Sequence, residues 1–128
     1  MSPCDNQGPS RVFRKPTMKA GVAHVEAPEE VLQAMLTARI HLDDVTEENG
    51  PLRLIPGSHR SGKTLRFDPG ASKSILAAEG DVLLMRPLVV HQSGNSHPGT
   101  RRHRCVFHLE FTASPVLPDR FAWQDFIR

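Results

Sequence analysis

The stretch from Asp81 to Phe111, DVLLMRPLVVHQSGNSHPGTRRHRCVFHLEF, decides the fold, because it reads as two apolar strands joined by a polar loop. Val82–Met85 and Leu88–Val90 are short β-prone runs bounded by turn residues, and His91 stands where this first strand ends. The second strand alternates with a period of two, so it has one apolar and one polar face. A buried polar face needs partners, since unpaired charges in a core are costly. A bound anion and a metal at His91 would supply them. The apolar face holds Cys105, Phe107, Leu109 and Phe111. The polar face holds Arg102, Arg104, Val106, His108 and Glu110.

The rest of the chain continues the pattern of short strands separated by turn residues. Leu36–Val45 alternates apolar and polar side chains, Glu47–Gly50 is a turn in which Asn49-Gly50 is a strong hairpin signal, and Leu52–Ile55 is the return strand. A further short strand is expected at Ile75–Ala78. The one helical signal is Pro28–Leu36, which starts with proline and two glutamates. This pattern predicts an all-β jelly-roll or barrel with one short helix.

Composition excludes several classes of protein. A chain of 128 residues has the length of one domain, and a formal net charge of +2 is too small to indicate nucleic acid binding. The two cysteines, Cys4 and Cys105, have no metal or redox spacing, which favours reduced thiols in a cytoplasmic protein. The polar start of the chain lacks the apolar segment that a secretion signal requires. No apolar run approaches the length that would cross a bilayer, so no membrane partner is expected.

Several of these segments, in this order, resemble the phytanoyl-CoA dioxygenase family. They are NGPLRLIPGSH at 49–59, Gly80-Asp81, His91 followed by Arg102, and the ending FHLEF at 107–111. The resemblance covers roughly Lys19–Phe111. It implies a double-stranded β-helix, the jelly-roll of the cupin-like proteins, that uses Fe(II) and 2-oxoglutarate. It also implies the hydroxylation of a small organic substrate.

The resemblance begins abruptly at Lys19, and this sets the expected domain organisation. Residues 1–18 are polar, contain three prolines and show no periodicity, so they are expected to be a disordered or loosely attached leader. Residues 19–128 are expected to be a partial double-stranded β-helix that lacks the family's N-terminal half. Two explanations are open: a truncated gene product, or a chain whose true start lies upstream.

The family's iron is held by a His-x-Asp pair and a later histidine. The resemblance identifies His91 as the later histidine, and its alternative role is to cap backbone groups at a strand end. His41-Leu42-Asp43 matches His-x-Asp, but it lies too close to Asn49, where the family has an additional strand. His41 and Asp43 are therefore the weaker candidates for metal ligands, and we expect them not to meet His91 around a common metal. Their simpler role would be hydrogen bonding to a neighbouring strand or to solvent.

The family holds 2-oxoglutarate with an arginine on the strand that follows the later histidine, because a guanidinium matches carboxylate geometry. Arg102 follows His91 by eleven residues and is the preferred candidate. Arg104 shares its face and fits better when the chain is aligned backwards from FHLEF. The alternative is a solvated basic cluster, Arg101–Arg104. As a nucleic acid site this cluster is weak, because it is short and has no interleaved aromatic residues.

The sequence therefore predicts an Fe(II)/2-oxoglutarate-dependent dioxygenase acting on a small molecule if its site is complete. The alternative is a non-catalytic jelly-roll remnant that binds a small anion or a partner chain. Without the family's N-terminal cover, one sheet face is expected to be exposed and to promote self-association. The candidate apolar sets are Leu36, Ala38, Ile40 and Leu42, and Phe107, Leu109 and Phe111.

Overall fold

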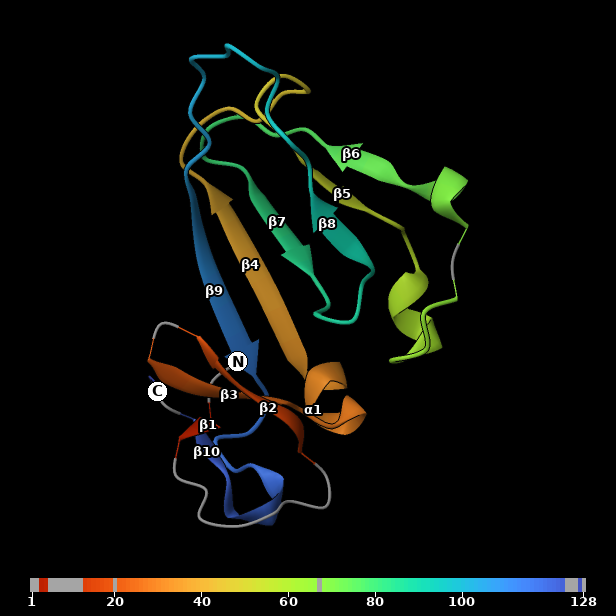
Figure 1. Ribbon diagram of the computed structural model, residues 1–128, viewed down its shortest axis with the longest axis vertical. Helices are drawn as coiled ribbons and strands as arrows, with labels where there is room; N and C mark the ends of the chain where they lie inside the picture. The colour runs from red at the N-terminus through yellow and green to blue at the C-terminus, as the bar shows by residue number, and fades with distance from the viewer. Residues whose placement is uncertain (1–2, 5–12, 20, 67, 124–126, 128) are drawn as a thin grey trace. The chain divides into compact units, whose positions relative to one another are not determined.

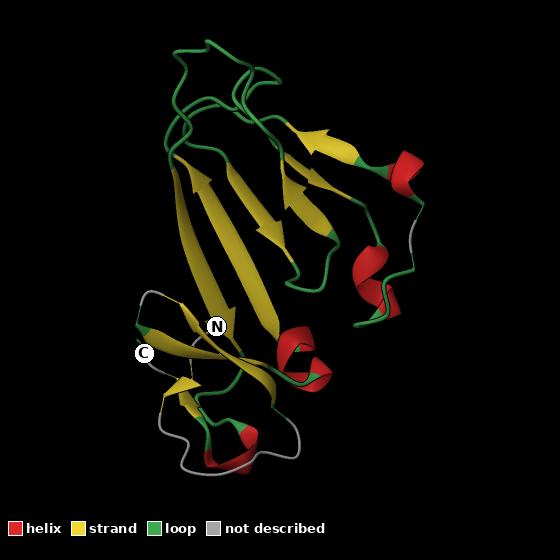
Figure 2. Ribbon diagram, in the orientation of Figure 1, coloured by secondary structure: helices red, strands yellow, loops and turns green. Residues whose placement is uncertain are grey.

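The structure, a computed structural model, describes residues 3–4, 13–19, 21–66, 68–123 and 127. These residues form mostly short β-strands, with one α-helix and three 3-10 turns (Figures 1 and 2). The prediction of an all-β chain with one short helix is confirmed. The protein divides into two compact units: Met35–Phe111 makes one, and the segments on either side of it together make the other.

The unit made of the two terminal segments contains two antiparallel strand pairs and the helix. Strand β1 pairs with β10, and β2 pairs with β3. Phe13 and Phe121 stack at the centre of its core, with ring centroids 4.0 Å apart, and Ala27 and Leu117 are buried beside them. The two terminal segments are therefore joined by packing, including residues that the sequence assigned to a leader. The elements are β1 (Pro3–Cys4), β2 (Arg14–Lys19), β3 (Val22–Glu26), α1 (Glu29–Gln33), a 3-10 turn (Pro118–Arg120) and β10 (Ala122–Trp123).

The Met35–Phe111 unit contains two three-stranded sheets, ordered β7-β4-β9 and β6-β5-β8. Neighbouring strands come from distant parts of the sequence, as a jelly-roll requires. Strand β4 is antiparallel to β7, and β5 is antiparallel to both β6 and β8. The elements are β4 (Met35–His41), β5 (Leu52–Leu54), 3-10 turns at Ser58–Ser61 and Pro69–Ala71, β6 (Lys73–Ile75), β7 (Val82–Met85), β8 (His91–Ser93) and β9 (Val106–Thr112).

Strand β4 has one buried face, formed by alternate residues. Met35, Thr37 and His41 are each at most 3% exposed, and Arg39 lies on the same face and is half-buried. In β7, Met85 lies opposite Thr37 and is also buried. On β4 and β7 this face of the sheet is therefore buried, whereas His108 and Glu110 of β9, which share it, are exposed.

The other face of the same sheet is apolar and much more exposed. In β7, Leu84 lies opposite Ala38 and Val82 opposite Ile40. The Leu42 N–H donates to the Cys105 carbonyl (3.0 Å) and the Ala113 N–H to the Ala34 carbonyl (3.0 Å), which fixes an antiparallel register for β4 and β9. That register brings the apolar side chains of β9 onto this face. Its exposed members, about half accessible each, are Leu42, Val82, Leu84, Phe107 and Phe111.

Several local expectations differ from the structure. The strand expected at Leu36–Val45 is β4 at Met35–His41, and the strand expected at Ile75–Ala78 is β6 at Lys73–Ile75, followed by an isolated bridge at Ala77. The run Leu88–Val90 is not a strand: the chain turns at Pro87-Leu88, where the Val89 N–H bonds the Arg86 carbonyl (3.0 Å), and β8 starts at His91. Pro87 has no N–H to give to a sheet, and this outweighs the β-propensity of the apolar residues that follow.

The turn expected at Glu47–Gly50 is present, but Asn49-Gly50 is not its tip. The turn lies at Glu47-Glu48, and Asn49 forms an isolated bridge with Ser96. Gly50 has φ +75°, and a Cβ there would lie 2.6 Å from the Gly94 carbonyl oxygen. Glycine is therefore needed for close contact between two loops as well as for its backbone angle.

In the described ranges, no helix is both long enough and apolar enough to span a membrane.

Candidate functional site

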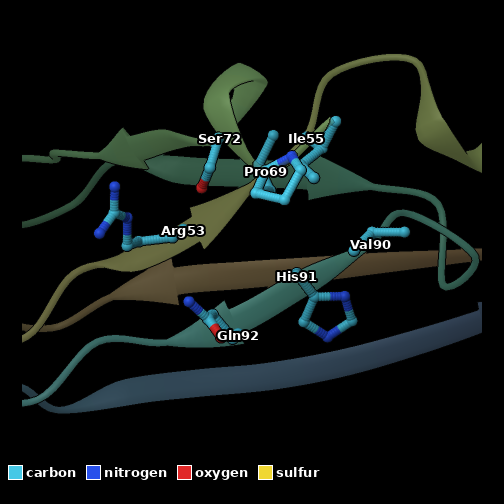
Figure 3. Close-up of a pocket in the computed structure, with 8 residues that line it drawn as sticks. Arg53, Ile55, Pro69, Ser72, Val90, His91 and Gln92 are labelled. Atoms are coloured by element: carbon cyan, nitrogen blue, oxygen red, sulfur yellow. The ribbon is translucent and has the colours of Figure 1, made fainter. Parts of the chain in front are cut away.

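The candidate site is built around His91, the first residue of β8. A pocket of about 220 Å³ opens beside it. Figure 3 shows His91 and Gln92 on β8 and Arg53 on the neighbouring strand β5, while Pro69 and Ser72 come from the segment before β6. The pocket is lined by Arg53, Leu54, Ile55, Pro69, Ser72, Val90, His91 and Gln92.

The residue that positions His91 is Ser58, which is 8% exposed. Its hydroxyl donates to the Ile55 carbonyl (2.7 Å) and accepts the N–H of Val90 (2.9 Å). The Ile55 N–H also donates to the Val90 carbonyl (3.0 Å). Ser58 therefore ties the end of β5 to the residue just before His91. The sequence analysis did not select Ser58, although the PGSH motif was a signal that could have identified it.

The ring of His91 is exposed and is oriented by its own strand. Its Nδ1 lies 2.6 Å from the Val89 carbonyl oxygen. Because a carbonyl can only accept, Nδ1 carries the proton in this contact, and Nε2 keeps a free lone pair. This is the arrangement in which histidines commonly bind metals.

His41 and Asp43 lie elsewhere and have other surroundings. The Asp43 Oδ2 accepts the N–H of Cys105 (2.7 Å), so this carboxylate ties the end of β4 to the start of β9. His41 is 2% exposed, and neither of its ring nitrogens has a hydrogen-bond partner. Burial lowers the pKa of His41, the charge of Arg39 lowers it further, and Asp81 opposes both effects. The imidazole is therefore neutral near pH 7.

Among the residues that the structure describes, no three His, Cys, Asp or Glu side chains form a group that could hold a metal ion. His91 has the right orientation for one ligand, but a site of the two-histidine, one-carboxylate type needs all three. The described residues do not fit a complete iron site by themselves.

The two candidate arginines have different environments, and both precede β9. The Nε of Arg102 lies 3.0 Å from the Glu48 carboxylate, and both side chains are substantially exposed. Arg104 is half-buried, and its buried NH1 atom has no hydrogen-bond partner. Arg102 already has an anionic partner, whereas no acidic side chain in the described part of the chain pairs with Arg104.

A third arginine, which the sequence interpretation did not select, belongs beside Arg104. Arg39 on β4 also has a buried, unpartnered Nε. Burial lowers the pKa of Arg39, and the charge of Arg104 lowers it further, so the two guanidinium groups are near enough to repel each other. The available signal was the position of Arg39 on the polar side of the alternating run at 36–45, which also contains His41.

The geometry can be compared with one known family. The model of the phytanoyl-CoA dioxygenase (PhyH) family matches residues 17–103, which is more than half of the chain. The match includes PGSH, Gly80-Asp81, His91 and Arg102, on which the resemblance was based, whereas FHLEF at 107–111 lies beyond it. The cupin-like jelly-roll of that family agrees with the antiparallel sheets seen here. The chain therefore belongs to the phytanoyl-CoA dioxygenase family.

Proposed function

We propose that this protein acts as a 2-oxoglutarate-dependent oxygenase that hydroxylates a small organic substrate. His91 would supply one iron ligand, and Arg104 would hold the co-substrate. Family membership supports the reaction class and the use of Fe(II) and 2-oxoglutarate. The single observation that carries the assignment to His91 is the 2.6 Å contact of its Nδ1 with the Val89 carbonyl, which leaves the lone pair of Nε2 unshared.

Two ligands beyond His91 are required by this proposal, and the described residues do not group them around it. His41 and Asp43 are unsuited to the task for physical reasons: the first is deeply buried, and the second is occupied by a backbone N–H. We therefore assign them no metal.

The choice between the two arginines follows from their partners. A guanidinium that is already paired with a carboxylate has less electrostatic benefit to offer a second one. Arg102 is paired with Glu48 and is exposed, where an ion pair contributes little. Arg104 is half-buried with an unmatched donor, and a charge-assisted hydrogen bond to a carboxylate is stronger there. This supports Arg104 over Arg102.

The direct test is succinate formation from 2-oxoglutarate with Fe(II), ascorbate and oxygen. The proposal expects turnover in the wild type, near-complete loss in His91→Gln and Arg104→Gln, and no change in Arg101→Gln, an exposed neighbour. Turnover that survives His91→Gln would show that this histidine is not a ligand, and the proposed site would be wrong.

A second candidate function is a non-catalytic module that binds a small anion. The unpartnered donors of Arg39 and Arg104 favour it, since they call for an anion whether or not a metal is present. Binding of 2-oxoglutarate or another oxyanion without any iron-dependent succinate formation would favour this second function.

A further inference from the structure

Four described side chains of the Met35–Phe111 unit have buried nitrogen atoms without a hydrogen-bond partner: Arg39 at Nε, Arg104 at NH1, His41 at both ring nitrogens and His59 at Nδ1. Three of these, Arg39, His41 and Arg104, lie on β4 or beside it. Most buried polar groups in folded proteins are hydrogen-bonded, so a cluster of unpartnered ones requires an explanation. A ligand that the protein binds in solution is one such explanation.

The three side chains share one part of the fold. Arg39 and His41 are two residues apart on β4 and therefore lie on the same, buried face. Arg104 comes from the segment that leads into β9, the neighbour of β4, and its charge acts on Arg39. On the side of β4 away from β9, Arg39 lies opposite Leu83 of β7, which is uncharged.

The carboxylates near this end of the sheet are occupied by backbone groups. Asp43 accepts from the Cys105 N–H (2.7 Å), and Asp81 accepts from the Ala78 N–H (2.8 Å). Neither bonds Arg39 or Arg104 in the described structure. These carboxylates keep their charge, but neither forms an ion pair with either arginine, and two like charges in a partly desolvated place repel each other.

We infer that Arg39 and Arg104 jointly hold one oxyanion group, a carboxylate or a phosphate, with His41 as a neutral N–H donor beside them. A guanidinium presents its donors as a planar fork that matches such groups. Two forks suit a group with several acceptor oxygens, and the neutral imidazole can donate one N–H whichever ring nitrogen carries the proton. The anion would remove both the mutual repulsion and the unmatched donors.

The inference adds Arg39 and His41 to the arginine used in the proposed function. It rests on that proposal only for the identity of the ligand as 2-oxoglutarate. The binding of an oxyanion itself requires no iron.

The test is calorimetry and thermal unfolding of the metal-free protein with sodium 2-oxoglutarate, succinate or phosphate, each compared with sodium chloride at equal ionic strength. We expect at least one oxyanion to bind and to raise the melting temperature. Arg39→Gln and Arg104→Gln should each weaken that binding by tenfold or more. Arg39→Lys should also weaken it, because it keeps the charge but loses the fork. Arg101→Gln should bind like the wild type.

Folding of the variants is checked by their urea midpoints without added anion. Because each Arg→Gln change removes an uncompensated charge, we expect the midpoint to stay the same or to rise. A lower midpoint for Arg39→Gln would mean that the guanidinium has a stabilising partner within the protein, and would overturn the inference.

The three anions separate this inference from the proposed function. Binding of 2-oxoglutarate and succinate supports both. Binding of phosphate alone, lost in the two Gln variants, supports the oxyanion site and contradicts the co-substrate assignment. No binding of any of the three, or binding that neither Gln variant weakens, would refute the inference.

Discussion

Replacing Asn49 with alanine tests whether one buried amide holds the two loops of the Met35–Phe111 unit together. Asn49 is 1% exposed. Its Nδ2 donates to the carbonyls of Asp44 and His103 (both 2.8 Å), and its Oδ1 accepts from the Thr46 N–H (2.9 Å). Alanine leaves all three backbone groups without this partner.

The size of the effect follows from those three contacts. Leaving one buried polar group unsatisfied costs about 1–3 kcal/mol, so three groups suggest a loss of about 3 kcal/mol or more. Water entering the space left by the amide would reduce this figure. A typical domain is stable by only about 5–15 kcal/mol, so a loss of that size is a large part of the total.

The measurement is urea unfolding at pH 7.5 of the wild type, Asn49→Ala and the control Asn95→Ala, an exposed asparagine in the opposing loop. We expect the midpoint of Asn49→Ala to fall sharply with little change in slope, and the control to remain within about 0.5 kcal/mol of the wild type. If Asn49→Ala behaves like Asn95→Ala, the amide does not hold the loops, and our account of this junction is wrong.

Three further predictions concern other parts of the same unit. Ser58→Ala should lower stability by about 1–3 kcal/mol in urea, because it leaves the Val90 N–H without its acceptor; an unchanged midpoint would show that water replaces the hydroxyl. Since the pKa of His41 is lowered, the unfolded chain binds more protons as pH falls through about 6.5. The wild type should therefore lose stability between pH 7.5 and 5.5, and His41→Gln should lose less; equal slopes would contradict this. Finally, the exposed apolar sheet face should promote self-association, so Phe107→Glu should reduce the mass measured by light scattering; a wild-type monomer would refute this.

The loops around Asn49 show which contacts a local sequence pattern cannot predict. Sequence reasoning identified Asn49-Gly50 from local turn chemistry, but the contacts that explain it join residues far apart in the chain. Asn49 bonds His103, and Gly50 lies against Gly94. Nothing in a local pattern states which distant loop will approach, so the role of the pair could be found only in the folded protein.

In the candidate site, too, local sequence identified a residue but not the environment of its neighbours. His91 was identified from the order of motifs, and the structure places it at the start of β8 rather than at a strand end. The environments of Arg102 and Arg104 could not be distinguished, because both precede β9 and have the same parity. Only tertiary contacts give Glu48 to Arg102 and leave Arg104 beside Arg39.

Four features could be inferred from the sequence: the all-β class, the short helix after Pro28, the strand Val82–Met85 and the family. They depend on local periodicity, on proline and glycine chemistry, and on motifs that occur in a fixed order. Which charged side chains have an ion-pair or hydrogen-bond partner could be seen only in the tertiary structure. Whether a side chain has a partner depends on which strands become neighbours, and β4 and β9 are separated by more than sixty residues of sequence. The unpaired donors of Arg39 and Arg104 could therefore not be identified without knowing that β4 and β9 are neighbours.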